Sequence, residues 1–193
     1  MRKTGNGTKV FIAGSRRLSR LNDDVRSRIE NIVDKGFAVV VGDANGVDKA
    51  VQQYLRTRNY GNVVVFCMEG GCRNNIGHWP TRTITAAHPQ RRDFEYYSTK
   101  DRAMSEAADY GLMLWDGRSR GTLTNIVHLV REGKPVVVYV AAESSFYTLR
   151  QSRQLAEMLD RFDPSALARI NGELQAVATP GRSSRKVDTA PLF

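Results

Sequence analysis

The stretch Val10-Phe11-Ile12-Ala13-Gly14-Ser15-Arg16-Arg17 decides the fold, because a hydrophobic strand ends there in a glycine followed by polar residues. The same arrangement occurs twice more. Gly42-Asp43-Ala44-Asn45-Gly46-Val47-Asp48 follows residues 37–41, and Asp116-Gly117-Arg118-Ser119-Arg120-Gly121-Thr122 follows residues 111–115. If the strands are parallel, the three loops converge at one edge of the sheet, which is where open α/β folds bind their ligands.

Strand and helix patterns alternate along the chain. This alternation predicts an α/β fold, a Rossmann-like parallel sheet flanked by helices in a single domain. Strands covered on both faces are indicated by apolar runs at residues 10–13, 37–41, 63–66, 112–115 and 136–140. Helices are expected over residues 22–35, 47–58, 98–108 and 122–133, with a further helical segment toward the C-terminal end.

Length and composition agree with one globular domain, since the 193 residues are 41% hydrophobic and 25% charged. We expect this domain to span residues 1–178. The periodicity fails between residues 67 and 97, and we interpret this stretch as a lid or an oligomer contact. Residues 179–193 contain proline, serine and basic residues without an apolar face, so a flexible basic tail is expected there.

The longest apolar run, Val136 to Ala142, is too short to span a bilayer, and the first residues lack the apolar core of a signal peptide. A cytoplasmic location is therefore expected. In such a reducing compartment Cys67 and Cys72 are expected to remain thiols. With His78 or His88 they match a zinc site poorly, so neither a metal nor another cofactor is expected.

The formal net charge of +9 favours anionic partners such as nucleotides or nucleic acid. Most of the arginines are expected to be scattered solubilising charges. Arg16 and Arg17 are exceptions, because they follow Gly14 directly at the predicted sheet edge. Gly14 is expected to let the backbone approach the ligand, so a larger side chain there would block binding and leave the fold intact.

The three loops predict a site for phosphate or ribose groups, because glycines permit close approach and the helix N-termini that follow offer N–H groups and a positive dipole end. The carboxylates have two interpretations. Asp116 is expected to accept from a ribose hydroxyl, whereas Asp48 is either a helix cap or a ligand contact. The ligand-binding residues expected from the loops are Gly14, Ser15, Arg16, Arg17, Gly42, Asp43, Ala44, Asn45, Gly46, Asp48, Asp116, Gly117, Gly121 and Thr122.

These loops, in this order, together with Lys100-Asp101-Arg102-Ala103-Met104, resemble the Rossmann-like SMF/LONELY GUY superfamily, also called SLOG, over about residues 9–140. The first half is similar to DprA proteins, whose loops read Gly-Ser-Arg and Gly-x-Ala-x-Gly-Ile-Asp. The second half is similar to LONELY GUY phosphoribohydrolases and nucleoside deoxyribosyltransferases. The resemblance implies a homodimer and a phosphate site that includes Arg102, Gly121 and Thr122.

One position departs from the enzymes of that superfamily. They carry a glutamate that works on the N-glycosidic bond three residues after Gly-Thr, where this chain has Asn125. An amide cannot act as a nucleophile or general base, although it can hydrogen-bond a ribose hydroxyl. Asn125 is therefore counted as a ligand-binding residue. No catalytic residue is assigned, and Asp43, Asp48 and Asp116 are the candidates if another carboxylate replaces the glutamate.

The sequence thus predicts a sensor or binding protein for a nucleotide-derived ligand, such as a nucleoside monophosphate or an ADP-ribose-like molecule. Two alternatives stay open. The first is an N-glycosidase, a hydrolase that acts on a nucleoside monophosphate. The second is a DprA-like protein that binds single-stranded DNA, which the positive charge permits. No membrane partner is expected.

Overall fold

Strand β1 (Lys9–Gly14) lies at the centre of the sheet, with β2 (Ala38–Gly42) on one side and β5 (Tyr110–Trp115) on the other. This computed structural model describes residues 7–87 and 94–162. Within them the sheet has seven strands in the order β4-β3-β2-β1-β5-β6-β7, and only the β6–β7 pair is antiparallel. The outer strands are β3 (Val63–Met68), β4 (Thr81–Ile84), β6 (Val136–Val140) and β7 (Ser145–Leu149).

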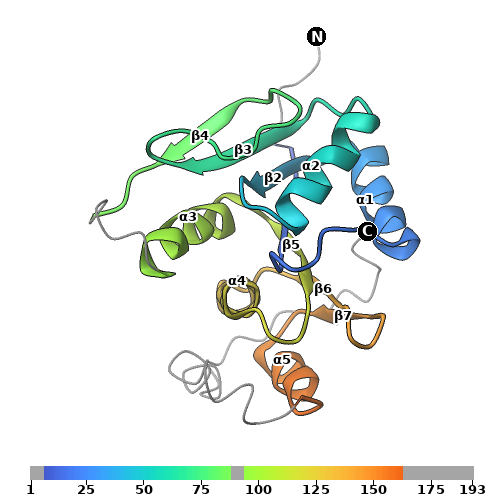
Figure 1. Ribbon diagram of the computed structural model, residues 1–193. Coiled ribbons are helices and arrows are strands. Elements are labelled where there is room, and N and C mark those ends of the chain that lie inside the picture. The colour runs from blue at the N-terminus through green and yellow to red at the C-terminus, as the bar shows by residue number, and fades with distance from the viewer. Residues whose placement is uncertain (1–6, 88–93, 163–193) are drawn as a thin grey trace.

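Helices cover both faces of the sheet (Figure 1). Side chains alternate along β1, so Val10 and Ile12 pack with α1 and α2 while Phe11 and Ala13 pack with α3, α4 and α5. The predicted α/β fold, a Rossmann-like sheet in a single domain, is confirmed. The helices of the described residues are α1 (Asp23–Asp34), α2 (Val47–Thr57), α3 (Phe94–Ala107), α4 (Arg120–Arg131) and α5 (Ser152–Leu159).

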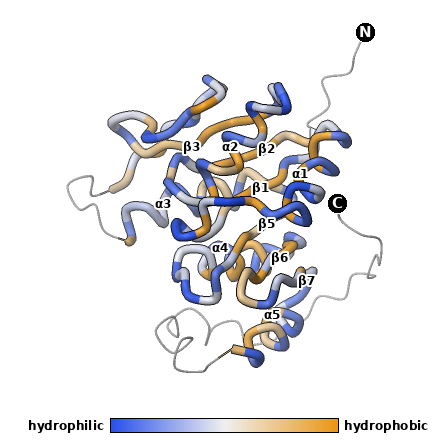
Figure 2. The backbone as a smooth tube through the Cα atoms, turned by 45° about the vertical axis from the view of Figure 1, so that its right-hand side comes forward, coloured by the Kyte–Doolittle hydropathy of each residue, from blue (hydrophilic) through white to orange (hydrophobic). Residues whose placement is uncertain are grey.

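The central strands are the most hydrophobic part of the chain, and the polar segments lie mainly in the helices and loops around them (Figure 2). This burial on two faces explains why β1, β2, β3, β5 and β6 were recognisable as continuous apolar runs. Among the helices in residues 7–87 and 94–162, none has both the length and the apolar composition needed to cross a membrane.

Helix boundaries follow local capping. The side chain of Asn22 accepts a hydrogen bond from the backbone N–H of Val25 at the start of α1, as an N-cap does. Helix α4 begins two residues earlier than predicted, because the side chain of Ser119 caps it. Helix α3 begins at Phe94, before the predicted start near residue 98.

Strands β4 and β7 were not predicted. Both lie at edges of the sheet, and β4 reads Thr-Arg-Thr-Ile with most of its residues exposed, so it lacks the apolar run of a central strand. The irregular stretch expected over residues 67–97 therefore contains a strand paired in parallel with β3, and its last residues belong to α3. Residues 88–93 and the predicted tail at 179–193 lie outside the described residues.

The expectation of two free thiols is wrong, because Cys67 and Cys72 form a disulfide with their Cα atoms 5.0 Å apart. Cys67 lies near the end of β3, and the chain then turns through Gly70 and Gly71, which both have positive φ. This turn brings Cys72 back beside Cys67 at the end of β3. The spacing of the two cysteines alone did not predict the disulfide.

Gly14 is a packing residue, and the expectation that a larger side chain would spare the fold is wrong. A Cβ atom at this position would overlap the carbonyl oxygen of Leu114 and would lie 2.7 Å from Cγ2 of Val47. Gly14 pairs with Leu114 in the β1–β5 register, so there is no room for a side chain between the two strands and α2.

We therefore expect Gly14→Ala to destabilise the protein by about 1–3 kcal/mol, the usual cost of overpacking a core. The matched substitution Gly121→Ala should raise stability by about 0.4–1 kcal/mol, since a Cβ there meets no atom and alanine restricts the unfolded chain. Urea unfolding of both variants and the parent measures the difference. Equal stability of the two variants would contradict the packing role of Gly14.

Candidate functional site

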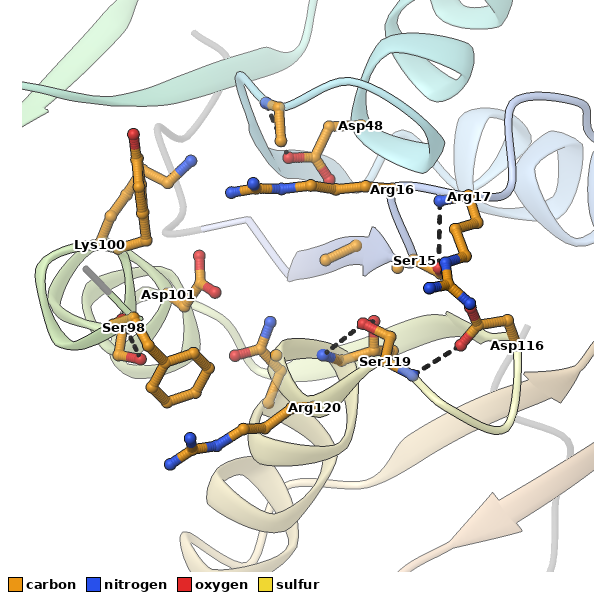
Figure 3. A pocket seen from close by; sticks show the side chains of 18 of the residues that line it. Ser15, Arg16, Arg17, Asp48, Ser98, Lys100, Asp101, Asp116, Ser119 and Arg120 are labelled. Carbon is orange, nitrogen blue, oxygen red and sulfur yellow. Dashed lines mark hydrogen bonds between the residues drawn. The ribbon is translucent and has the colours of Figure 1, made fainter. Parts of the chain in front are cut away.

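A cavity of about 500 Å³ opens at the edge of the sheet where the predicted loops converge. It lies beyond the carboxyl ends of β1 and β5, between α3 and the N-terminus of α4. Figure 3 shows Arg16, Asp101 and Arg120 around the same open space, each from a different element. The predicted ligand residues that line the cavity are Gly14, Ser15, Arg16, Arg17, Ala44, Asp48, Asp116, Gly121, Thr122 and Asn125.

Several predicted residues of the second loop support the cavity without lining it. Gly46 has φ of 79°, and a Cβ there would collide with the backbone of Arg16, so the first two loops pack directly together. The place of a side chain at Gly42 is taken by the carboxyl of Asp48. Asn45 accepts a hydrogen bond from Asn74 and is exposed.

Gly117 and Arg102 also lie outside the cavity lining. Gly117 has φ of 78° and forms the turn between β5 and α4. Arg102 is exposed, because it is about 200° around α3 from Lys100, which does line the cavity. The basic side chain that this helix contributes to the cavity is therefore Lys100. Arg102, which the family resemblance implied, lies on another face of the helix.

The structure adds residues that were not among the predicted ligand-binding residues. Six of them lie on α3, at a spacing that would have identified one face of that helix had its start been predicted correctly. Arg73 belongs to the irregular stretch after the disulfide and carried no signal. The added lining residues are Ala13, Arg73, Phe94, Tyr97, Ser98, Lys100, Asp101, Met104, Arg118, Ser119 and Arg120.

Asp116 joins the first and third loops. Its carboxylate accepts from the hydroxyl of Ser15 at 2.8 Å and from the backbone N–H groups of Arg118 at 3.0 Å and Ser119 at 2.7 Å. Burial would raise the pKa of Asp116, but these hydrogen bonds outweigh it and lower that pKa below its usual value. Asp116 thus stays ionised and fixes the turn that leads into α4.

The N-terminus of α4 faces the cavity. The side chain of Ser119 accepts a hydrogen bond from the backbone N–H of Thr122. The N–H groups of Arg120 and Gly121 also lie in the first turn, so the helix offers them no carbonyl partner. A Cβ at Gly121 would meet nothing within 4 Å. This end of α4 therefore presents backbone donors and a positive dipole end to open space.

Cationic side chains dominate the charged part of the wall. Arg16, Arg17, Arg118 and Arg120 are exposed at the cavity. Two aromatic rings of α3 hold some of these cations in place. Arg16 and Arg73 lie 5.3 Å and 4.9 Å from the ring of Tyr97, and Arg120 lies 4.0 Å from that of Phe94.

Asp43 is 1% exposed and binds two cations behind the cavity. Oδ1 lies 2.7 Å from Nζ of Lys100 and 2.7 Å from a terminal nitrogen of Arg73, while Oδ2 accepts from the backbone N–H of Arg73 at 3.1 Å. Burial raises the pKa of Asp43, yet the hydrogen bonds from Arg73 and the charge of Lys100 bring it well below its usual range. Asp43 is thus a fixed anion that positions both cations.

Two other carboxyl groups in the cavity behave differently. Burial raises the pKa of Asp48 to about 6, against the opposing charge of Lys100 and with the support of Asp101. Burial also raises the pKa of Asp101, opposed by Lys100 and by a hydrogen bond from Asn125. Within residues 7–87 and 94–162, no group of three or more His, Cys, Asp or Glu side chains is arranged to hold a metal ion.

The raised pKa of Asp48 predicts a pH dependence of stability. Folding takes up a proton at this group between its usual pKa of 3.8 and about 6, so its contribution is most favourable below about pH 4 and declines as the pH rises through 6. Asp48→Asn should remove that decline, gaining up to about 3 kcal/mol over the parent at pH 7. Urea unfolding between pH 4 and 7 measures it, and a constant difference across this range would contradict the assignment.

Comparison with known proteins supports the fold. The structure is similar to that of DNA processing protein A from Helicobacter pylori, with a TM-score of 0.54 and 16% identity over 88% of this chain and 81% of that chain. That structure was described for the single-stranded DNA binding mode of the protein. No family profile matches this sequence, and no curated protein matches it. At this level of identity, the likeness is one of fold: the Rossmann-like sheet with its helices.

Proposed function

We propose that this protein binds a phosphate-bearing, nucleotide-derived small molecule in the cavity, with the phosphate at the N-terminus of α4. The observation that carries the proposal is the open helix N-terminus at Arg120 and Gly121, facing a cavity that is lined by exposed arginines. A helix N-terminus supplies backbone donors and a favourable dipole to a phosphate. Arg120, Arg118 and Arg17 add charge-assisted hydrogen bonds.

The cavity favours a ligand larger than inorganic phosphate. Its volume of about 500 Å³ falls within the range of small-molecule sites. Phe94 and Tyr97 add aromatic rings to the wall formed by α3, where Arg120, Arg16 and Arg73 pack against them. A nucleotide matches this lining, because its base can stack on planar side chains and its phosphate needs donors and positive charge.

Calorimetric titration with matched pairs tests the proposal. The ligands are the common ribonucleoside 5′-monophosphates, ADP-ribose, the corresponding nucleosides, and a short single-stranded deoxyoligonucleotide. We expect at least one nucleotide to bind and its nucleoside to bind much more weakly. The absence of binding by every nucleotide, with salt-sensitive binding of the oligonucleotide, would contradict the proposal and favour single-stranded DNA as the ligand.

Arg120→Gln should weaken nucleotide binding by about 1.5–3 kcal/mol, the range for a hydrogen bond to a charged group. Arg153→Gln is the matched control, since Arg153 lies on the exposed face of α5, where it pairs with Glu157. The same titrations measure both. Equal affinity of the two variants for a nucleotide would show that Arg120 does not contact the phosphate.

A second candidate function is cleavage of the N-glycosidic bond of the bound nucleotide. The observation that favours it is the pair of cavity carboxyl groups with raised pKa, Asp48 and Asp101, because a carboxyl group that titrates nearer neutrality can exchange protons with a reacting group. Chromatography of free base after long incubation tests this function. Release that is lost in Asp48→Asn or Asp101→Asn, and kept in Asp34→Asn on the exposed face of α1, would establish it.

A further inference from the structure

The disulfide lies next to a side chain of the cavity. Cys72 is bonded to Cys67 at the end of β3, and the next residue, Arg73, lines the cavity. Arg73 binds Asp43 through its backbone N–H, 3.1 Å from Oδ2, and through its guanidinium, 2.7 Å from Oδ1. Asp43 and Cys67 directly follow the last residue pair of the β2–β3 register, so they lie at adjacent strand ends. Two successive residues are thus attached to two neighbouring strands, one by a covalent bond and the other by an ion pair.

The chain beyond Arg73 is held separately, by the buried side chain of Gln52 in α2. The amide nitrogen of Gln52 donates to the carbonyl oxygen of Asn74 at 3.1 Å, and its amide oxygen accepts from the backbone N–H of Ile76 at 2.9 Å. These bonds do not involve the disulfide, so this part of the chain stays in place when the disulfide opens. The part that gains freedom is the turn of residues 69–72, with Arg73 at its end.

The two sulfur atoms differ in their access to solvent. Cys67 is 1% exposed and packs in the core, whereas Cys72 is partly exposed and follows the exposed Gly71. A thiolate that approaches from solvent therefore reaches Sγ of Cys72 first. The chain has two cysteines in all, so no other thiol of the same chain exchanges with this pair.

We infer that this disulfide is a reversible redox site, coupled to the position of Arg73 and through it to the affinity of the cavity for an anion. The reductant is a dithiol. One of its thiolates attacks Sγ of Cys72, the S–S bond breaks, and Cys67 leaves and takes up a proton. The second thiol then displaces Cys72 from the mixed disulfide. The protein gains two electrons and two protons as two thiols, and the dithiol is oxidised to a disulfide.

Opening the disulfide removes one of the two attachments of Arg73. The side chain of Arg73 is 38% exposed and its guanidinium lies 4.9 Å from the ring of Tyr97, so it can move toward solvent. The cavity wall then loses a cation, while Asp43 keeps its charge and its bond to Lys100. The oxidised protein should consequently bind an anionic ligand more tightly than the reduced protein. This effect on the ligand rests on the proposed function, whereas the coupling between the disulfide and Arg73 does not.

The first test needs no ligand. The protein is equilibrated in mixtures of reduced and oxidised dithiothreitol, its free thiols are alkylated, and mass spectrometry gives the fraction that retains the disulfide. In Arg73→Gln, half-reduction should need a ratio of reduced to oxidised dithiothreitol at least about twofold lower than in the parent, because neighbouring attachments are coupled. Arg153→Gln, which alters an exposed pair on α5, should match the parent. Equal ratios for Arg73→Gln and the parent, or a disulfide that no mixture reduces in the folded protein, would overturn the inference.

The second test measures the effect on the ligand. Calorimetry with the nucleotide that binds the parent most tightly is carried out with and without excess dithiothreitol. We expect the reduced parent to bind at least about fivefold more weakly, the lower end of typical coupling between two sites. Cys72→Ser, which cannot form the disulfide, should bind as weakly as the reduced parent under both conditions. Equal affinity of the oxidised and reduced parent would overturn the effect on the ligand. The absence of nucleotide binding in both states would overturn the proposed function, and the redox titration would still decide the coupling to Arg73.

Discussion

Replacing Gly121 by leucine is expected to abolish nucleotide binding, with a loss of affinity of more than about 100-fold, and to leave the fold unchanged. Leucine is a good helix former, and a Cβ at Gly121 meets no protein atom, so the added side chain extends into open space. It would occupy the place that we assign to the phosphate at the N-terminus of α4. Calorimetry with the nucleotide that binds the parent most tightly measures the loss.

Gly61→Leu is the matched control for that experiment. Gly61 also has open space around a Cβ, and it lies before β3, outside the cavity lining. The two variants should unfold at similar urea concentrations, and only Gly121→Leu should lose binding. Full affinity in a folded Gly121→Leu protein would place the phosphate somewhere other than this helix end.

Asp43→Asn is expected to produce the largest loss of stability, about 3–5 kcal/mol, because it removes one partner of a buried ion pair. Lys100 is 2% exposed, and Asp43 lies 2.7 Å from its ammonium group. An amide there would leave the charge of Lys100 without its nearest counterion. Arg73 would lose the same partner, although its side chain is partly exposed and can be solvated.

Urea unfolding of Asp43→Asn, Lys100→Met and the double variant separates the pair from other effects. The double variant should be more stable than Asp43→Asn, since no uncompensated buried charge remains in it. Asp34→Asn, at an exposed position in α1, should change stability by less than about 0.5 kcal/mol. A small loss in Asp43→Asn, comparable to that control, would contradict the role of Asp43 as the anchor of two cations.

The central strands and their loops could be predicted because they depend on local physics. Residues buried on both faces of a parallel sheet form apolar runs, and a glycine followed by polar residues marks the end of such a run. This reasoning found β1, β2, β5 and the loops at Gly14 and Gly121. The edge strand β4 is exposed and polar, so the same signal does not exist there.

Other parts of the site depend on contacts between distant segments. Arg73 reaches the cavity because the chain turns back after Cys67, and its guanidinium binds Asp43, thirty residues earlier. The sequence predicted that Asp43 contacts the ligand, whereas in the structure its carboxylate binds Arg73 and Lys100. Likewise, Gly42 and Gly46 are small because other groups occupy the adjacent space, which the sequence does not distinguish from space left for a ligand.

The charged groups in and behind the cavity have different roles. Asp43 and Asp116 are ionised and engaged with protein donors, so they position side chains and turns. The exposed arginines and the end of α4 are available to an anion. Asp48 and Asp101, whose pKa values burial raises, are the carboxyl groups that can respond to a ligand or to pH.

The most direct test of the central claim is the backbone amide resonance of Gly121 in a nuclear magnetic resonance titration of the ¹⁵N-labelled protein with ribonucleoside 5′-monophosphates and ADP-ribose. Binding of a phosphate at the N-terminus of α4 predicts a saturable shift of the Gly121 and Arg120 amides for a nucleotide, and no such shift for the matching nucleoside. Unchanged Gly121 and Arg120 amides in the presence of a bound nucleotide, or equal shifts with nucleoside and nucleotide, would contradict it.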